Sequence, residues 1–211
     1  MHTKLLTAAT LAALTTAGTA SAATIAEEDF DGNSTLGFTY SPALGSFSSS
    51  TDIWDSVSSL ATISVGSGNF LGARDIENGD NPNVDFATAT TASFDLSLFE
   101  ATSFSFDYDI DGFDAGDSVS YTVTIDGVES APVFLVTGLN GVGGVFGDGN
   151  EAVAIPDAAS SFSFELNVTQ NGGSDYAGFD NFVLAGTVIP EPMAAGAAGL
   201  LGLVGLRRRR A

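Results

Sequence analysis

Hydrophobic and polar residues alternate with a period of two in several stretches of the chain. Residues 103–110 read SFSFDYDI, which places aromatic and aliphatic side chains on one side and serine and aspartate on the other. Residues 118–126 and 161–169 repeat the pattern. Because successive side chains of a β-strand point to opposite faces, each stretch predicts a half-buried strand. No helical periodicity is sustained between residues 24 and 187, so the pattern predicts an all-β chain.

Half-buried strands need a second sheet to cover their apolar sides, and 16 phenylalanines are available to fill the space between two sheets. The sequence therefore predicts an antiparallel β-sandwich in a single domain over residues 24–187. The turn at 111–116 predicts a hairpin between two alternating stretches, and the three-residue spacing of Phe179 and Phe182 predicts a bulge at Asp180 and Asn181. Further strands are expected at 25–30, 36–40, 61–65, 84–88, 93–98, 128–136 and 179–185. Long loops are expected at 66–83 and 137–150.

The two ends of the chain differ from this pattern. Residues 1–23 carry Lys4, a short apolar segment and the small-residue site AlaSerAla at 20–22, which predicts a secretory signal peptide. Residues 188–211 combine two prolines, a segment of apolar and small residues at 193–206, and a block of arginines. Such a block resists crossing a membrane, so the domain upstream is expected on the far side.

This C-terminal segment resembles the PEP-CTERM sorting signal of exported bacterial proteins. The residues that carry the resemblance are Pro190, Glu191, Pro192, Arg207, Arg208, Arg209 and Arg210. It implies an exosortase-like membrane enzyme as partner, transient anchoring in the inner membrane through a short membrane helix, and release or re-anchoring at the cell surface or in the extracellular matrix. The alternative is a plain tail anchor, for which the apolar segment is short.

Charge narrows the choice of partners. Of 26 acidic residues, Glu191 alone lies outside 24–187, and of six basic residues, Arg74 alone lies inside. A domain carrying about 24 net negative charges repels phosphate backbones and anionic lipids, which argues against nucleic acid and membrane-surface partners. The charge either attracts cations or only keeps the protein soluble. The chain has no cysteine and therefore no disulfides.

A dense row of carboxylates suggests structural calcium. It comprises Asp107, Asp109, Asp111, Asp114 and Asp117, with Gly112 at the position where calcium loops turn. Ser118 stands where an EF-hand has a bidentate glutamate, so a calcium loop in a β context is the hypothesis. The alternative is that these aspartates are solvent-facing residues of a strand and a polar turn.

Short motifs spread along the domain resemble those of secreted bacterial jelly-roll modules, including carbohydrate-binding ones. They are EDFDG at 28–32, FLGARD at 70–75, the spaced aspartates Asp111, Asp114 and Asp117, and FDNFVL at 179–184. The resemblance implies that the first and last strands are neighbours. It also implies a second candidate calcium site at Glu28, Asp29 and Asp180.

The residue inventory argues against catalysis. Histidine and lysine occur once each, as His2 and Lys4 in the signal segment, which excludes histidine-based triads, Schiff-base chemistry and His-ligated zinc in the domain. Carboxylates remain, and Asp75, Glu77 and Asp80 are the cluster that a glycosidase could use.

Sugar binding without catalysis would need exposed aromatic rings, for which Trp54 and Tyr176 are the candidates, against the alternative of core packing. The sequence thus predicts a non-enzymatic exported protein of the cell surface or matrix. A glycan-binding module, with extracellular polysaccharide as partner, is the alternative, and a carboxylate-dependent glycosidase is less favoured.

Overall fold

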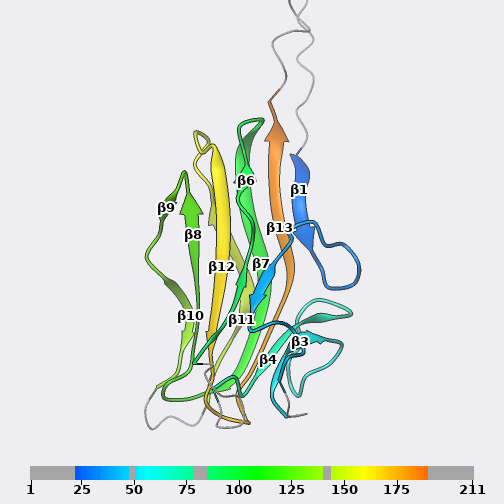
Figure 1. Cartoon of the computed structure of the whole chain (residues 1–211), viewed down its shortest axis with the longest axis vertical. Coiled ribbons are helices and arrows are strands. Elements are labelled where there is room, and N and C mark those ends of the chain that lie inside the picture. The colour runs from blue at the N-terminus through cyan, green and yellow to red at the C-terminus, as the bar shows by residue number, and fades with distance from the viewer. Residues whose placement is uncertain (1–21, 48–50, 78–84, 140–143, 190–211) are drawn as a thin grey trace, which may run out of the picture.

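The computed structural model describes residues 22–47, 51–77, 85–139 and 144–189. This part of the chain forms thirteen β-strands (Figure 1). They are β1 (Ala22–Glu28), β2 (Thr39–Ser41), β3 (Ile53–Val57), β4 (Phe70–Arg74), β5 (Ala87–Thr90), β6 (Phe94–Asp95), β7 (Phe99–Phe113), β8 (Ser118–Ile125), β9 (Val128–Glu129), β10 (Val133–Thr137), β11 (Val145–Ala154), β12 (Ser161–Thr169) and β13 (Tyr176–Val188).

The strands form two antiparallel sheets, which confirms the predicted all-β sandwich. Sheet A has six strands in the order β11-β7-β13-β4-β3, with β1 also paired to β13. Sheet B has seven strands in the order β10-β8-β12-β5-β2, with β6 paired to β12 and β9 to β8. Strands distant in sequence are neighbours in both sheets, so the connections repeatedly cross from one sheet to the other.

The hairpin predicted between the first two alternating stretches is wrong. β7 belongs to sheet A and β8 to sheet B, so the segment at 114–117 is a corner between the sheets. The alternation placed the apolar sides of both strands correctly but did not specify their partners. The two apolar rows face each other across the core, where the rings of Phe106 and Tyr121 meet edge to face at 5.8 Å.

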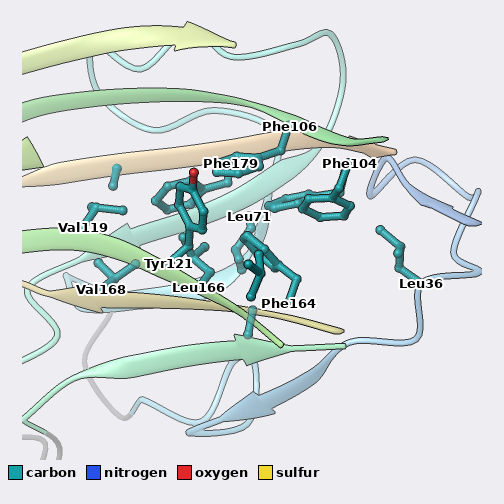
Figure 2. Packing of buried hydrophobic residues seen from close by; sticks show 14 of the residues in the cluster. Leu36, Leu71, Phe104, Phe106, Val119, Tyr121, Phe164, Leu166, Val168 and Phe179 are labelled. Carbon is teal, nitrogen blue, oxygen red and sulfur yellow. The ribbon is translucent and has the colours of Figure 1, made fainter. Parts of the chain in front are cut away.

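The core between the sheets is mainly aromatic (Figure 2). Phe104 and Phe106 from β7 meet Phe164 from β12 with ring centroids 4.6 and 5.4 Å apart. Phe182 from β13 stacks on Phe106 at 5.1 Å. Large rings from three strands thus fill the space between the sheets, and the burial of this apolar area is the main term that holds them together.

The glycine-rich stretches differ most from expectation. β3, β4 and β11 were not predicted; β4 lies inside the predicted loop 66–83, and β11 begins inside the predicted loop 137–150 and continues to Ala154. The strand predicted at 61–65 is wrong, because this segment is a loop that lies on the outer side of sheet A. There Ile63 and Val65 pack over Gly178, where a Cβ atom would lie 2.4 Å from Ile63. The remaining predicted strands are present with shifted ends, and the interval 128–136 is divided between β9 and β10.

The bulge predicted in the last strand is confirmed. The register of β13 against β7 shifts between Asp180 and Val183, and Asn181 has a φ of 52°. The extra residue turns both Phe179 and Phe182 into the core, where each is fully buried.

Both ends of the described domain lie at one end of the sandwich (Figure 1). Ala22 in β1 is the register partner of Thr187 in β13, so the first and last strands are neighbours, as the resemblance implied. The predicted signal peptide, up to residue 21, and the sorting motif with its membrane helix at 190–211 lie outside the described residues. Within the described part, no helix is long and apolar enough to cross a membrane.

Candidate functional site

The two sheets carry very different charges. In sheet A, β7 contributes Glu100, Asp107, Asp109 and Asp111, and every other strand except β4 adds at least one further carboxylate. In the seven strands of sheet B the acidic residues are Glu165 in β12, Asp95 in β6 and Glu129 in β9. The acidity of the domain is therefore concentrated on sheet A and the loops.

The three aspartates of β7 do not converge on one point. Asp107 accepts hydrogen bonds from the side-chain amides of Asn150 and Asn181, both at 2.8 Å. Asp109 accepts the backbone N–H of Ser64 at 2.6 Å, and Asp111 accepts the hydroxyl of Thr62. Alternate residues of a strand lie roughly 7 Å apart. Each carboxylate thus has its own protein donor, and the loop at 60–69 is attached to the row.

The other two aspartates of this candidate set lie at the corner between β7 and β8. Asp114 is exposed, whereas Asp117 is buried and accepts the backbone N–H groups of Asp114 at 2.7 Å and Asn171 at 2.9 Å. Asp117 therefore ties this corner to the connection between β12 and β13. Burial, the dominant effect, raises the pKa of Asp117.

In the second candidate set, Glu28 and Asp29 are engaged by local donors. Glu28 accepts the backbone N–H of Phe30 at 3.1 Å and the hydroxyl of Ser34 at 2.5 Å. One carboxylate oxygen of Asp29 accepts the backbone N–H groups of residues 31, 32 and 33, and these hydrogen bonds lower its pKa. Asp29 thus closes the turn after β1.

Asp180 differs from every other member of both sets. It is 1% exposed, and its Oδ1 atom is buried without a hydrogen-bond partner. Gly66 lies directly over it: a Cβ atom on Gly66 would fall 1.8 Å from Asp180 Oδ2. Burial raises the pKa of Asp180 to about 6, with further contributions from Asp31, Asp107 and Asp29.

The structure brings one member of each predicted set together and adds a residue that sequence reasoning missed. Asp180 is the register partner of Asp107. Asp31 approaches the same loop, accepting the backbone N–H of Asn69 at 2.8 Å beside Gly68. Asp31 belongs to the EDFDG motif, but its position near Asp180 follows only from the folded loop at 66–69. Within the described ranges, no group of three or more His, Cys, Asp or Glu side chains is placed to hold a metal ion.

The expected aromatic platforms are not free surfaces. The prediction of an exposed Trp54 is wrong: this side chain is 1% exposed and packs edge to face on Tyr40 at 6.2 Å, because β3 turns it into the core. Tyr176 is half-buried against the cluster of Leu60, Ile63, Val65 and Phe70. The guanidinium of Arg74 lies over its ring at 5.3 Å, which occupies one ring face.

The carboxylates considered for glycoside hydrolysis lie after β4. Asp75 is half-buried and Glu77 is exposed, while Asp80 lies outside the described residues. The neighbouring Arg74 donates Nε and Nη2 to the carbonyl oxygen of Gly173 at 3.0 and 2.7 Å. This arginine therefore fastens the turn before β13 rather than presenting its charge to a ligand.

The outer side of sheet B is lined by small polar side chains. One row across the strands, given by the register, is Phe134, Ser120, Asn167, Thr88 and Ser41. The next row is Thr122, Glu165, Thr90 and Thr39. Thr90 donates its hydroxyl to the Glu165 carboxylate at 3.1 Å. Hydroxyl groups and one amide thus form most of this face.

The sequence matches no protein-family model. It also matches no curated protein. Among solved structures, the K3 cleaved adhesin domain of Lys-gingipain from Porphyromonas gingivalis W83 is 14% identical, with a TM-score of 0.44 over 77% of this chain and 99% of that one. The CBM22-1 xylan-binding domain of Xyn10C from Paenibacillus barcinonensis is 13% identical, with a TM-score of 0.39 over 82% of this chain and 100% of that one. These similarities are distant, and no residue role is carried over from them.

Proposed function

We propose that this protein is an exported, non-catalytic component of the cell surface or extracellular matrix, sorted through its C-terminal segment. The observation that carries the proposal is the pairing of β1 with β13, in which Thr24, the first residue after the predicted signal peptide, is the partner of Ala185; this pairing brings both ends of the domain to one end of the sandwich. A domain attached in this way projects its opposite end and both sheet faces away from the point of attachment. That arrangement suits display on a surface.

The motif of Pro190, Glu191 and Pro192, followed by the apolar segment and four arginines, supports the route. An exosortase-like membrane enzyme is the proposed partner, and cleavage near the motif would end the transient membrane anchoring. The experiment is envelope fractionation of the native host carrying the wild-type chain or a variant with all three motif residues replaced by alanine. The proposal predicts that the variant stays in the inner membrane with its tail. If the variant reaches the surface fraction as well as wild type, the sorting proposal fails.

Calcium is proposed as a structural ion at the loop that covers Asp180. The buried Oδ1 atom without a partner is the observation that favours this position, because a buried carboxylate gains most from a nearby cation. Asp31 and Asp107 are the neighbouring acidic groups there. The aspartates of β7 and of the corner fit a single ion less well. Asp109, Asp111 and Asp117 each accept a hydrogen bond from a different protein group, so their carboxylates do not converge on one point.

A glycan-binding module is the second candidate, and a specific observation favours it. The strands β8, β12, β5 and β2 at the centre of sheet B carry one acidic residue, Glu165, in a domain that is otherwise strongly acidic, while Asp95 and Glu129 stand on the short strands β6 and β9. Such a face is the surface on which an uncharged polar ligand could lie without displacing counterions. The residues expected from sequence, Trp54 and Tyr176, lie elsewhere.

A further inference from the structure

Two exposed phenylalanines stand on the outer side of sheet B, at opposite edges of its polar centre. Phe134 in β10 is 58% exposed and is the register partner of Ser120, which lies on the outer side of β8. Phe86 is 51% exposed and immediately precedes β5. Ala87 is fully buried opposite Val168, so the alternation of the strand puts Phe86 on the outer side.

The register fixes how the two rings are related. Phe134 lies on β10 and Phe86 beside β5, with β8 and β12 between them. Three strand intervals correspond to roughly 14 Å, and the rings differ by one row along the strands, roughly 7 Å. Ser118, Ser120, Asn167 and Thr169 occupy the surface between the rings. These four polar residues form a surface, called the polar floor below, between the two exposed aromatic rings.

This combination matches the chemistry of a neutral sugar chain. Sugar rings present C–H groups that pack on aromatic faces, and hydroxyl groups that exchange hydrogen bonds with serine, threonine and asparagine side chains. A protein partner would bring a larger apolar area, and an anionic polymer would be repelled by about 24 net negative charges. β8, β12, β5 and β2 carry one acidic residue, Glu165, so an uncharged chain that covers these strands removes few charged groups from water.

We infer that an uncharged polysaccharide binds across the outer side of sheet B, with its sugar rings on Phe86 and Phe134 and its hydroxyl groups on the floor between them. This inference rests on the proposed function, since it names the ligand class of a surface-displayed protein. It places the contact away from Trp54 and Tyr176. Asn167 lies at the centre of the floor and offers both a donor and an acceptor.

The test is affinity electrophoresis of the full chain in gels containing dextran, laminarin or galactomannan, with alginate as an anionic polymer. The variants are Phe86→Ala with Phe134→Ala on sheet B, and the control Phe146→Ala, a ring on β11 of sheet A that is 68% exposed. All three positions are exposed, so the fold should survive, and an unchanged melting temperature checks that. We expect retardation by at least one neutral polymer, a loss of affinity of about tenfold or more in the double variant, and full retention in Phe146→Ala.

Three results would overturn the inference: no retardation by any neutral polymer, equal weakening in Phe146→Ala, or stronger retardation by alginate. Light scattering tests whether a second copy of the chain, rather than a polysaccharide, binds this face. A concentration-dependent dimer that Phe134→Ala dissociates would reassign the face to a second copy of the chain. Sorting is read separately, by fractionation, so a protein that reaches the surface without binding neutral polymers refutes this inference and leaves the proposed function standing.

Discussion

Asp180 and Asp107 are register partners on β13 and β7, and the side chain of the intervening bulge residue, Asn181, donates to Asp107 at 2.8 Å. Two carboxylates that are far apart in sequence therefore meet beneath one loop. The Oδ1 atom of Asp180 is buried there without a partner. This contact is the reason to place the proposed cation at Asp180 rather than in the turn after β7.

Calcium should raise the melting temperature through Asp180. At a calcium concentration 100 times the dissociation constant, the gain in the free energy of unfolding is about 2.7 kcal/mol. That gain corresponds to roughly 5–10 °C for a domain of this size. Asp180→Asn should remove the calcium-specific part, whereas Asp109→Asn with Asp111→Asn should keep it. Magnesium and matched ionic strength are the controls, since screening would respond to both. If Asp180→Asn keeps the calcium-specific shift and the variant Asp109→Asn with Asp111→Asn loses it, the ion lies at the β7 aspartates instead.

Gly66→Ala should destabilise the domain more than Gly37→Ala. The two glycines have similar φ angles, 57° and 61°, so the backbone cost of alanine is similar. A Cβ atom on Gly66 would overlap Asp180, whereas one on Gly37 meets nothing within 4 Å. We expect an additional loss of about 1–3 kcal/mol at Gly66, measured by urea unfolding. Equal losses would mean that the loop does not press on Asp180.

Phe106→Ala should cost about 3–5 kcal/mol, because this fully buried ring contacts rings from both sheets. Phe146→Ala, at a ring that is 68% exposed, should change the free energy of unfolding by no more than about 0.5 kcal/mol. Chemical denaturation of both variants gives the comparison. Similar small effects at the two positions would contradict the aromatic core.

Stability should decrease as the pH rises from about 4 to about 7. Burial raises the pKa of Asp175 to about 7 from an ordinary value of 3.8, and the negative charges of the neighbouring Asp117, Asp114 and Asp75 add to this effect. The folded state then binds this proton more tightly than the unfolded state, so raising the pH removes a stabilising proton. Asp180 acts in the same direction, up to about pH 6.

Melting temperatures from pH 4 to pH 8 test this linkage. Asp175→Asn, which resembles the protonated form, should reduce the decrease substantially. Asp95→Asn removes the same charge at an exposed position and should leave the decrease nearly unchanged. An identical decrease in the wild type and Asp175→Asn would show that general charge repulsion, not this carboxyl group, sets the pH dependence.

Alternation in the sequence was sufficient to predict the fold class and the inward rows of β7, β8 and β12. It could not predict strand pairing, because an apolar row fits any covering sheet, and so a corner was interpreted as a hairpin. β11 was missed because Gly147 and Gly149 resemble loop residues, yet Gly147 lets β11 approach Val136 of β10 closely. Strand pairing and the close approach of segments are properties of the whole fold.

The candidate site shows the same limit. The carboxylates were visible in the sequence, but their partners were not, since Asp109 and Asp111 bind the loop at 60–69 and Asp31 reaches Asn69. The lone tryptophan appeared suited to a surface role beside two aspartates, yet the register of β3 buries it opposite Ala73. The polar centre of sheet B, with Glu165 as its acidic residue, became visible only when strands distant in sequence were placed side by side.

Intact mass spectrometry of the protein isolated from the envelope or matrix of its native host tests the central claim most directly. If the C-terminal segment is a sorting signal, the mass should correspond to a chain without residues 1–23 and without Arg207, Arg208, Arg209 and Arg210, cut near Pro190, Glu191 and Pro192. A mass that includes the four arginines in the surface fraction would contradict the account.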